Sequence, residues 1–149
     1  MNNKILAGLI LSAALTGGLY YYVNFRKVYI INVHQDHYSA SIIVDQFPYS
    51  DNKKIKWWLS NRQQILEKYK INPFNENGAI SYYFYEIGEG YQPLEQQDRI
   101  CFDDMQPPAN CLDKNLLMKI QRTRGNNVIF SSDSGSYLLD KDNKISKLH

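Results

Sequence analysis

The sequence has few of the residues from which metal clusters and redox sites are built, with two cysteines and three histidines among its 149 residues. A zinc site held by four cysteines is therefore excluded. The chain also has no second apolar run beside the one near its amino terminus, no internal repeat and no low-complexity tract. We therefore expect one membrane element and one soluble domain, and no catalytic motif accompanies them.

The single apolar run covers residues 5–23, nineteen residues without a charge. A helix of this length spans roughly 28 Å, close to the hydrocarbon thickness of a bilayer. It ends in Tyr20, Tyr21 and Tyr22, and aromatic side chains favour the membrane–water interface. A cleaved signal peptide is the alternative, but the small-residue pairs inside the run match a cleavage site poorly. We expect a retained anchor over residues 1–27 and a soluble domain over residues 28–149.

The charges that flank the run do not orient it, because Lys4 precedes it and Arg26 and Lys27 follow it. The cysteines are more informative. Cys101 and Cys111 lie close together in the soluble part, which favours a disulfide in an oxidising compartment, worth about 2–3 kcal/mol. The alternative is two reduced thiols in the cytoplasm. We therefore expect the amino terminus inside and the domain outside.

The domain after residue 27 is nearly neutral, with fourteen Lys and Arg against fifteen Asp and Glu, which argues against a nucleic-acid partner. The charges are unevenly distributed, and they form either two solvated faces or two complementary patches. Basic residues gather at Lys53, Lys54, Lys56, Arg62, Lys68 and Lys70. Acidic residues gather at Glu86, Glu89, Glu95, Asp98, Asp103 and Asp104.

The domain is predicted to contain one helix and several short strands. Apolar residues at helical spacing after Ser50, a possible N-cap, predict a helix over residues 51–70, with Trp58 on its buried stripe and Trp57 near the edge of that stripe. Residues 34–37 are typical of a polar turn. Strands are predicted over 28–33, 40–45, 79–87, 99–102, 128–131, 137–139 and 144–148, whereas 116–123 fits a helix or a strand. The pattern predicts the α+β class: an antiparallel sheet with one main packed helix.

Three patterns suggest chemistry, and each has a simpler explanation. His34 and His37 with Asp36 resemble part of a metal site, but a third neighbouring histidine is missing. Cys101 is a possible nucleophile, but the acidic residues beside it oppose its activation and the disulfide explains it better. Glu86 and Glu89 form a possible acid and base pair of the glycosidase type, on very weak evidence. We therefore expect no metal, no cofactor and no enzymatic activity.

Tyrosine is the unusual residue of this chain, with twelve copies, nine of them after residue 28. Most are expected to fill the wet edge of a small core. Tyrosine also gives large contact area at low entropy cost and is enriched where proteins bind proteins. The cluster of tyrosines beside acidic residues is therefore the candidate partner-binding face, formed by Tyr83, Tyr85, Glu86, Glu89 and Tyr91.

Four runs of the chain resemble a family of enterobacterial membrane proteins of unknown function. They are IVDQFP (43–48), KIKWW (54–58), DRICFDDM (98–105) and NCLDKN (110–115). The two runs that contain cysteine are the more specific, and the resemblance extends over nearly the whole chain. It implies association with the bacterial inner membrane and supports pairing of Cys101 with Cys111. It implies no activity, cofactor or catalytic residue.

These observations lead to two hypotheses about function. The first is a non-enzymatic, single-pass inner-membrane protein whose periplasmic domain binds another protein, in its sharper form an immunity protein that captures a delivered toxin. The second is an accessory subunit of an envelope complex that assembles through the membrane helix. Gly8 with Ser12, or Ala13 with Gly17, has the small-residue spacing that lets helices approach closely.

Overall fold

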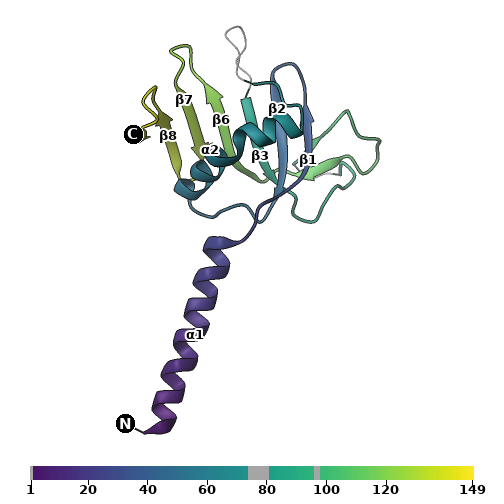
Figure 1. The fold of residues 1–149 in the computed structure, drawn as a ribbon. Coiled ribbons are helices and arrows are strands. Elements are labelled where there is room, and N and C mark those ends of the chain that lie inside the picture. Colours follow the sequence, from purple (N-terminus) through teal and green to yellow (C-terminus); the bar gives the residue numbers. More distant parts are fainter. Residues whose placement is uncertain (1, 74–80, 96–97) are drawn as a thin grey trace.

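The computed structural model describes residues 2–73, 81–95 and 98–149, and it consists of a long helix followed by an α+β domain. Helix α1 (Asn3–Phe25) begins at Asn2, whose side chain accepts a hydrogen bond from the Lys4 amide. Its segment Asn3–Val23 is long and apolar enough to cross a membrane, and none of it is buried by the domain. Figure 1 shows α1 extending away from the domain as a separate stalk.

The domain is built on a seven-stranded sheet in the order β1-β2-β3-β6-β7-β8-β9. The strands of this sheet are β1 (Tyr29–Gln35), β2 (Ser39–Asp45), β3 (Ser81–Glu86), β6 (Leu116–Arg122), β7 (Val128–Ser132), β8 (Gly135–Leu139) and β9 (Ile145–Leu148). The α+β class is confirmed. The segment that fitted a helix or a strand is strand β6, and residues 79–80 of a predicted strand lie outside the described residues.

One strand pair departs from the predicted antiparallel sheet. Strands β2 and β3 pair in parallel, whereas the other neighbours in the sheet are antiparallel. Helix α2 (Asp51–Lys68) lies between these two strands in sequence and returns the chain to the end of the sheet where β2 began. A parallel pair requires such a crossover, so the helix itself is the reason for the mixed sheet.

Helix α2 covers one face of the sheet and builds the main core. Ser50 is its N-cap and accepts a hydrogen bond from the Lys53 amide, as predicted, but the helix ends at Lys68 rather than residue 70. Trp58 is buried and packs edge-on against Phe84 of β3. Trp57 is partly buried at the edge of this core, as expected. The alternation along β2 and β3 places every second side chain toward α2.

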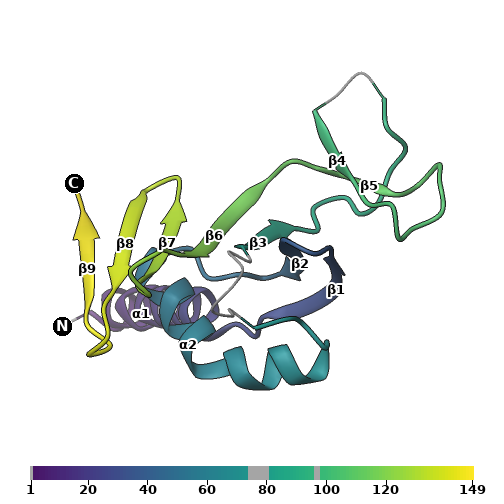
Figure 2. The ribbon, with the colours of Figure 1, turned by 90° about the horizontal axis from the view of Figure 1, so that it is seen from above.

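A smaller core forms on the opposite face. There the short hairpin of β4 (Arg99–Cys101) and β5 (Cys111–Asp113) packs through Phe102 and Leu112 against Ile43 and Tyr85 of the sheet. The disulfide between Cys101 and Cys111 joins β4 and β5 at paired positions. Figure 2 shows α2 on one side of the sheet and β4 and β5 beyond the other. We call the insertion between β3 and β6, residues 87–115, the acidic lobe.

The first hairpin turns later than predicted. His34 and Gln35 belong to β1, because the turn is formed by the Asp36 carboxylate, which accepts hydrogen bonds from the backbone amides of Tyr38 and Ser39. His34 is therefore a buried residue of a strand and not part of a polar turn. As a residue of β1, His34 lies in the contact between the sheet and the acidic lobe.

Candidate functional site

His34 is the polar centre of the contact between the sheet and the acidic lobe. The side chain is 5% exposed, and its ring stacks on Phe102 at a centroid distance of 3.8 Å. Backbone pairing in the hairpin places His34 beside Ser41 of β2, on the face opposite α2. A buried imidazole requires hydrogen-bond partners for its nitrogens, and the acidic lobe provides both.

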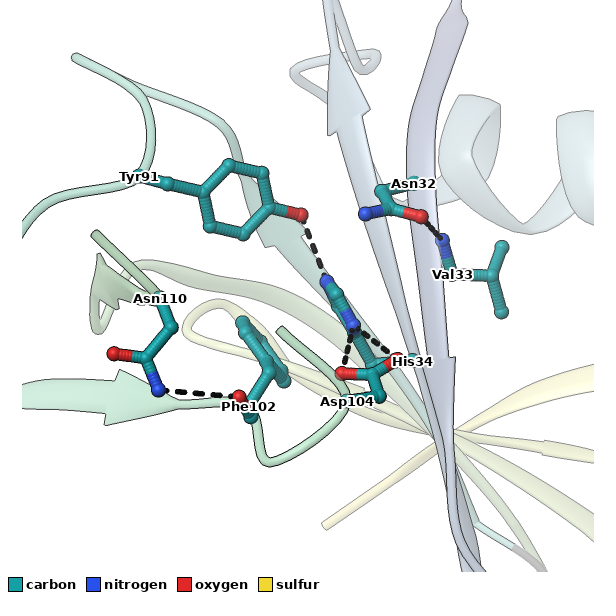
Figure 3. A network of polar contacts seen from close by, with 7 residues as sticks. All are labelled: Asn32, Val33, His34, Tyr91, Phe102, Asp104 and Asn110. Carbon is teal, nitrogen blue, oxygen red and sulfur yellow. Dashed lines mark hydrogen bonds and ion pairs between the residues drawn. The ribbon is translucent and has the colours of Figure 1, made fainter. Parts of the chain in front are cut away.

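The two partners of His34 are an acid and a phenol. Nδ1 lies 2.7 and 2.8 Å from the carboxylate oxygens of Asp104, and Nε2 lies 2.8 Å from the hydroxyl of Tyr91. Figure 3 shows the ring between these two groups. Because a carboxylate only accepts, Nδ1 carries a proton and donates a hydrogen bond to Asp104. In the neutral ring Nε2 then accepts from Tyr91, and in the charged ring it donates to the same oxygen.

Tyr91 is held in its protonated form. Burial raises the pKa of the Tyr91 hydroxyl, a hydrogen bond from Asn32 lowers it, and the negative charge of Asp104 raises it again. A protonated phenol donates to Nε2 when the histidine is neutral, and it is a poor nucleophile. The hydrogen bonds among tyrosine, histidine and aspartate therefore hold the acidic lobe against β1.

Further contacts fix the shape of the acidic lobe from within. Arg99 donates to Asp113 at 2.8 Å and to the Pro93 carbonyl at 2.6 Å, and Lys114 lies 3.3 Å from Asp98. The Asn110 side chain donates to the Phe102 carbonyl. Both basic residues of the acidic lobe are thus already paired with carboxylates.

The remaining carboxylates give the acidic lobe its charge. Residues 87–115 contain six Asp and Glu but only two Lys and Arg. Glu89, Glu95 and Asp103 are exposed and belong to no ion pair among the described residues. Leu94 is 63% exposed between two of them in the sequence. This surface combines net negative charge with the exposed large apolar side chain of Leu94.

The residues of the predicted partner-binding face fall in different environments. Tyr85 is 6% exposed and belongs to the smaller core, and burial is the largest cause of the raised pKa of its hydroxyl, with Tyr83 adding to it. Tyr83 is partly buried, with the ammonium of Lys119 5.4 Å from its ring centroid. Tyr91 fastens the acidic lobe, as described above. Glu86 is exposed and accepts from Asn115, and Glu89 is exposed.

The interpretation of this segment changes accordingly. Tyr85 and Tyr91 pack inward, and the exposed residues of the predicted face are Glu86 and Glu89. Sequence reasoning missed Asp104 as the partner of His34. Seventy positions separate the two residues, and no local pattern signals such a contact.

His34 and His37 do not come together as metal ligands. His37 is exposed in the hairpin turn, whereas His34 points into the contact with the acidic lobe. Within residues 2–73, 81–95 and 98–149, no group of three or more His, Cys, Asp or Glu side chains is arranged to hold a metal ion. A cavity of about 220 Å³ between the hairpin turn and the acidic lobe is lined by His34, Ser41 and Asp104.

The fold defines a class: an α+β domain that follows one candidate membrane-spanning helix and carries a disulfide-closed acidic insertion. The chain belongs to the family described as Enterobacterial putative membrane protein (DUF943), which matches residues 1–149. The match includes α1 and the acidic lobe, and the description names no activity. No curated protein and no solved structure matches the chain.

Proposed function

We propose that this chain is a non-enzymatic, single-pass inner-membrane protein whose α1 is retained as an anchor and whose periplasmic domain binds a basic protein through the acidic lobe. The observation that carries the proposal is the unbalanced charge of this insertion. Its two bases are engaged with Asp113 and Asp98, which leaves Glu89, Glu95 and Asp103 accessible. Charge of one sign on a preformed surface accelerates capture of an oppositely charged partner.

Two features of the acidic lobe support a rigid surface that binds a partner. The disulfide joins the two strands of the lobe's own hairpin, and the His34 network holds the acidic lobe on the sheet, so little conformational entropy is lost on binding. The disulfide also supports the periplasmic orientation, because such bonds persist in oxidising compartments. The sharper form of the proposal is an immunity protein, which holds a basic toxin at the membrane of the cell that produces it.

The test is a comparison of two variants with equal charge changes. The lobe variant combines Glu89→Gln, Glu95→Gln and Asp103→Asn. The control combines Glu67→Gln, Asp133→Asn and Asp142→Asn, which are exposed carboxylates outside the acidic lobe. Each tagged full-length protein is solubilised from membranes, and co-purifying proteins are quantified by mass spectrometry.

We expect a basic protein to co-purify in stoichiometric amount with the wild type and with the control variant. The lobe variant should lose it by about tenfold or more, since removal of surface charges mainly slows association. Equal recovery with both variants would show that the acidic lobe is not the binding surface. A partner with toxin activity that this protein neutralises would establish the immunity form.

A second function is favoured by the exposure of α1. Gly8, Ser12, Ala13 and Gly17 are all exposed on this helix, and nothing within 4 Å surrounds a side chain placed at either glycine. Small residues at this spacing allow a second membrane helix to pack closely. Replacing α1 with an unrelated membrane helix separates the two functions: partner capture by the acidic lobe should survive the exchange, whereas assembly through α1 should not.

A further inference from the structure

A cavity lies where the domain meets the membrane helix. It has a volume of about 510 Å³ and is formed between the first residues after α1 and the exposed side of α2. Its lining includes three cations and three aromatic side chains: Arg26, Lys27, Lys68, Tyr29, Trp57 and Tyr69. It is separate from the acidic lobe, which packs on the opposite face of the sheet.

The cavity begins near the outer edge of the lipid headgroup layer if α1 crosses the bilayer. The candidate span ends at Val23, and α1 stays helical to Phe25. Lys27 is then at most about 10 Å beyond the end of the span along the chain. The polar headgroup layer extends about 5–8 Å beyond the hydrocarbon on each side. Figure 1 shows the chain passing from the end of α1 directly into β1.

The cations around the cavity lack a carboxylate partner among the described residues. In the part of the chain that the structure describes, no carboxylate forms an ion pair with Arg26, Lys27 or Lys68. Lys27 and Lys68 instead lie 5.5 and 5.3 Å from the ring centroids of Tyr29 and Tyr69. Such uncompensated charges beside aromatic faces suit an anion that carries apolar groups.

Arg26 is also positioned to contact an anion in the cavity. Its guanidinium lies 4.2 Å from the ring centroid of Tyr49 and donates to the carbonyl of Phe47 and the hydroxyl of Tyr49. Its Nε is buried and has no hydrogen-bond partner among the described residues. A buried donor without a partner is costly, and an anion at the cavity would satisfy it.

We propose that this cavity binds the phosphate headgroup of an anionic glycerophospholipid from the leaflet in which α1 ends. A volume of about 510 Å³ accommodates a headgroup and its glycerol, within the range of small-ligand pockets, while the acyl chains remain in the bilayer. Binding fixes the domain relative to the membrane surface. The proposal is independent of any protein partner of the acidic lobe.

The experiment uses the purified full-length protein in an uncharged detergent. Short-chain phosphatidylglycerol, short-chain phosphatidylcholine and inorganic phosphate are titrated separately. Binding is followed by tryptophan fluorescence, because Trp57, one of the two tryptophans, lines the cavity. The cavity variant combines Lys27→Gln with Lys68→Gln, two exposed positions. The control combines Lys53→Gln with Lys56→Gln, which removes the same charge from the first turns of α2. Circular dichroism verifies that both variants are folded.

We expect saturable binding of phosphatidylglycerol that the cavity variant weakens by about 30-fold, given the attraction of each basic residue to an anionic membrane surface. The control variant should bind as the wild type does. Four results would overturn the proposal: no saturable binding, equal affinity for phosphatidylcholine, equal losses in both variants, or inorganic phosphate binding as tightly as the lipid. The last would assign the cavity to a soluble phosphate compound.

Discussion

At the scale of single residues, His34 links two parts of the chain that have no local relation. The imidazole stacks on Phe102 and bonds Asp104 and Tyr91, all from the acidic lobe. Its position in a strand follows from Asp36, whose carboxylate closes the turn two residues later. The sequence predicted a polar turn at this point because short-range patterns do not show where a strand pair ends.

The His34 network predicts a stability effect at Asp104. The substitution Asp104→Asn removes the charge that accepts from Nδ1 and should lower the free energy of unfolding by about 1–2 kcal/mol. Asp103→Asn is the matched control, because Asp103 is exposed and His34 bonds its neighbour Asp104 instead. Thermal unfolding and amide exchange in β4 and β5 measure the effect. Equal stability of the two variants would contradict a fastening role for His34.

Asp36 predicts a dependence of stability on pH. Hydrogen bonds from the Tyr38 and Ser39 amides outweigh partial burial and lower the pKa of the Asp36 carboxyl below its ordinary value. A carboxyl with a lowered folded-state pKa stabilises the protein above its unfolded pKa, and this contribution disappears as pH falls through the folded value. The stability difference between wild type and Asp36→Ala should therefore shrink at acidic pH. A difference that stays constant down to pH ~2 would rule out this contribution.

At the scale of elements, helix α2 and most strands were predictable, whereas the pairing of distant strands was not. Ser50 and an apolar stripe that includes Trp58 are local signals, and both are found in place. The parallel pairing of β2 with β3 and the existence of β5 depend on contacts between distant segments. The same is true of Tyr85, whose burial results from packing by the acidic lobe.

The disulfide predicts that the two cores differ in their response to reduction. Cys101→Ser with Cys111→Ser should destabilise the acidic lobe by about 2–3 kcal/mol, because the bond closes a short loop. The core between α2 and the sheet contains neither cysteine and should stay folded. Limited proteolysis with mass spectrometry should show faster cleavage within residues 98–113 and unchanged protection of α2. Simultaneous cleavage of both regions would show a single cooperative unit.

At the scale of the whole molecule, the acidic and basic clusters seen in the sequence lie on opposite faces of the sheet. The acidic lobe packs on one face of the sheet, and the basic residues of α2 lie on the other. Arg26 and Lys27 add to the basic side next to the candidate span. This separation supports one surface directed to lipid and another directed to a partner. Sequence alone showed the two charge clusters but not the faces on which they lie.

The central claim is that the acidic lobe contacts a basic protein in the periplasm, and crosslinking in living cells tests it most directly. A photo-reactive amino acid is placed at Glu89 in the full-length protein, with Lys144 before β9 as the control position. The account predicts a discrete adduct with a basic periplasmic protein from position 89 only, lost when Glu95 and Asp103 are neutralised. The same adduct from both positions, or one that persists after neutralisation, would contradict it.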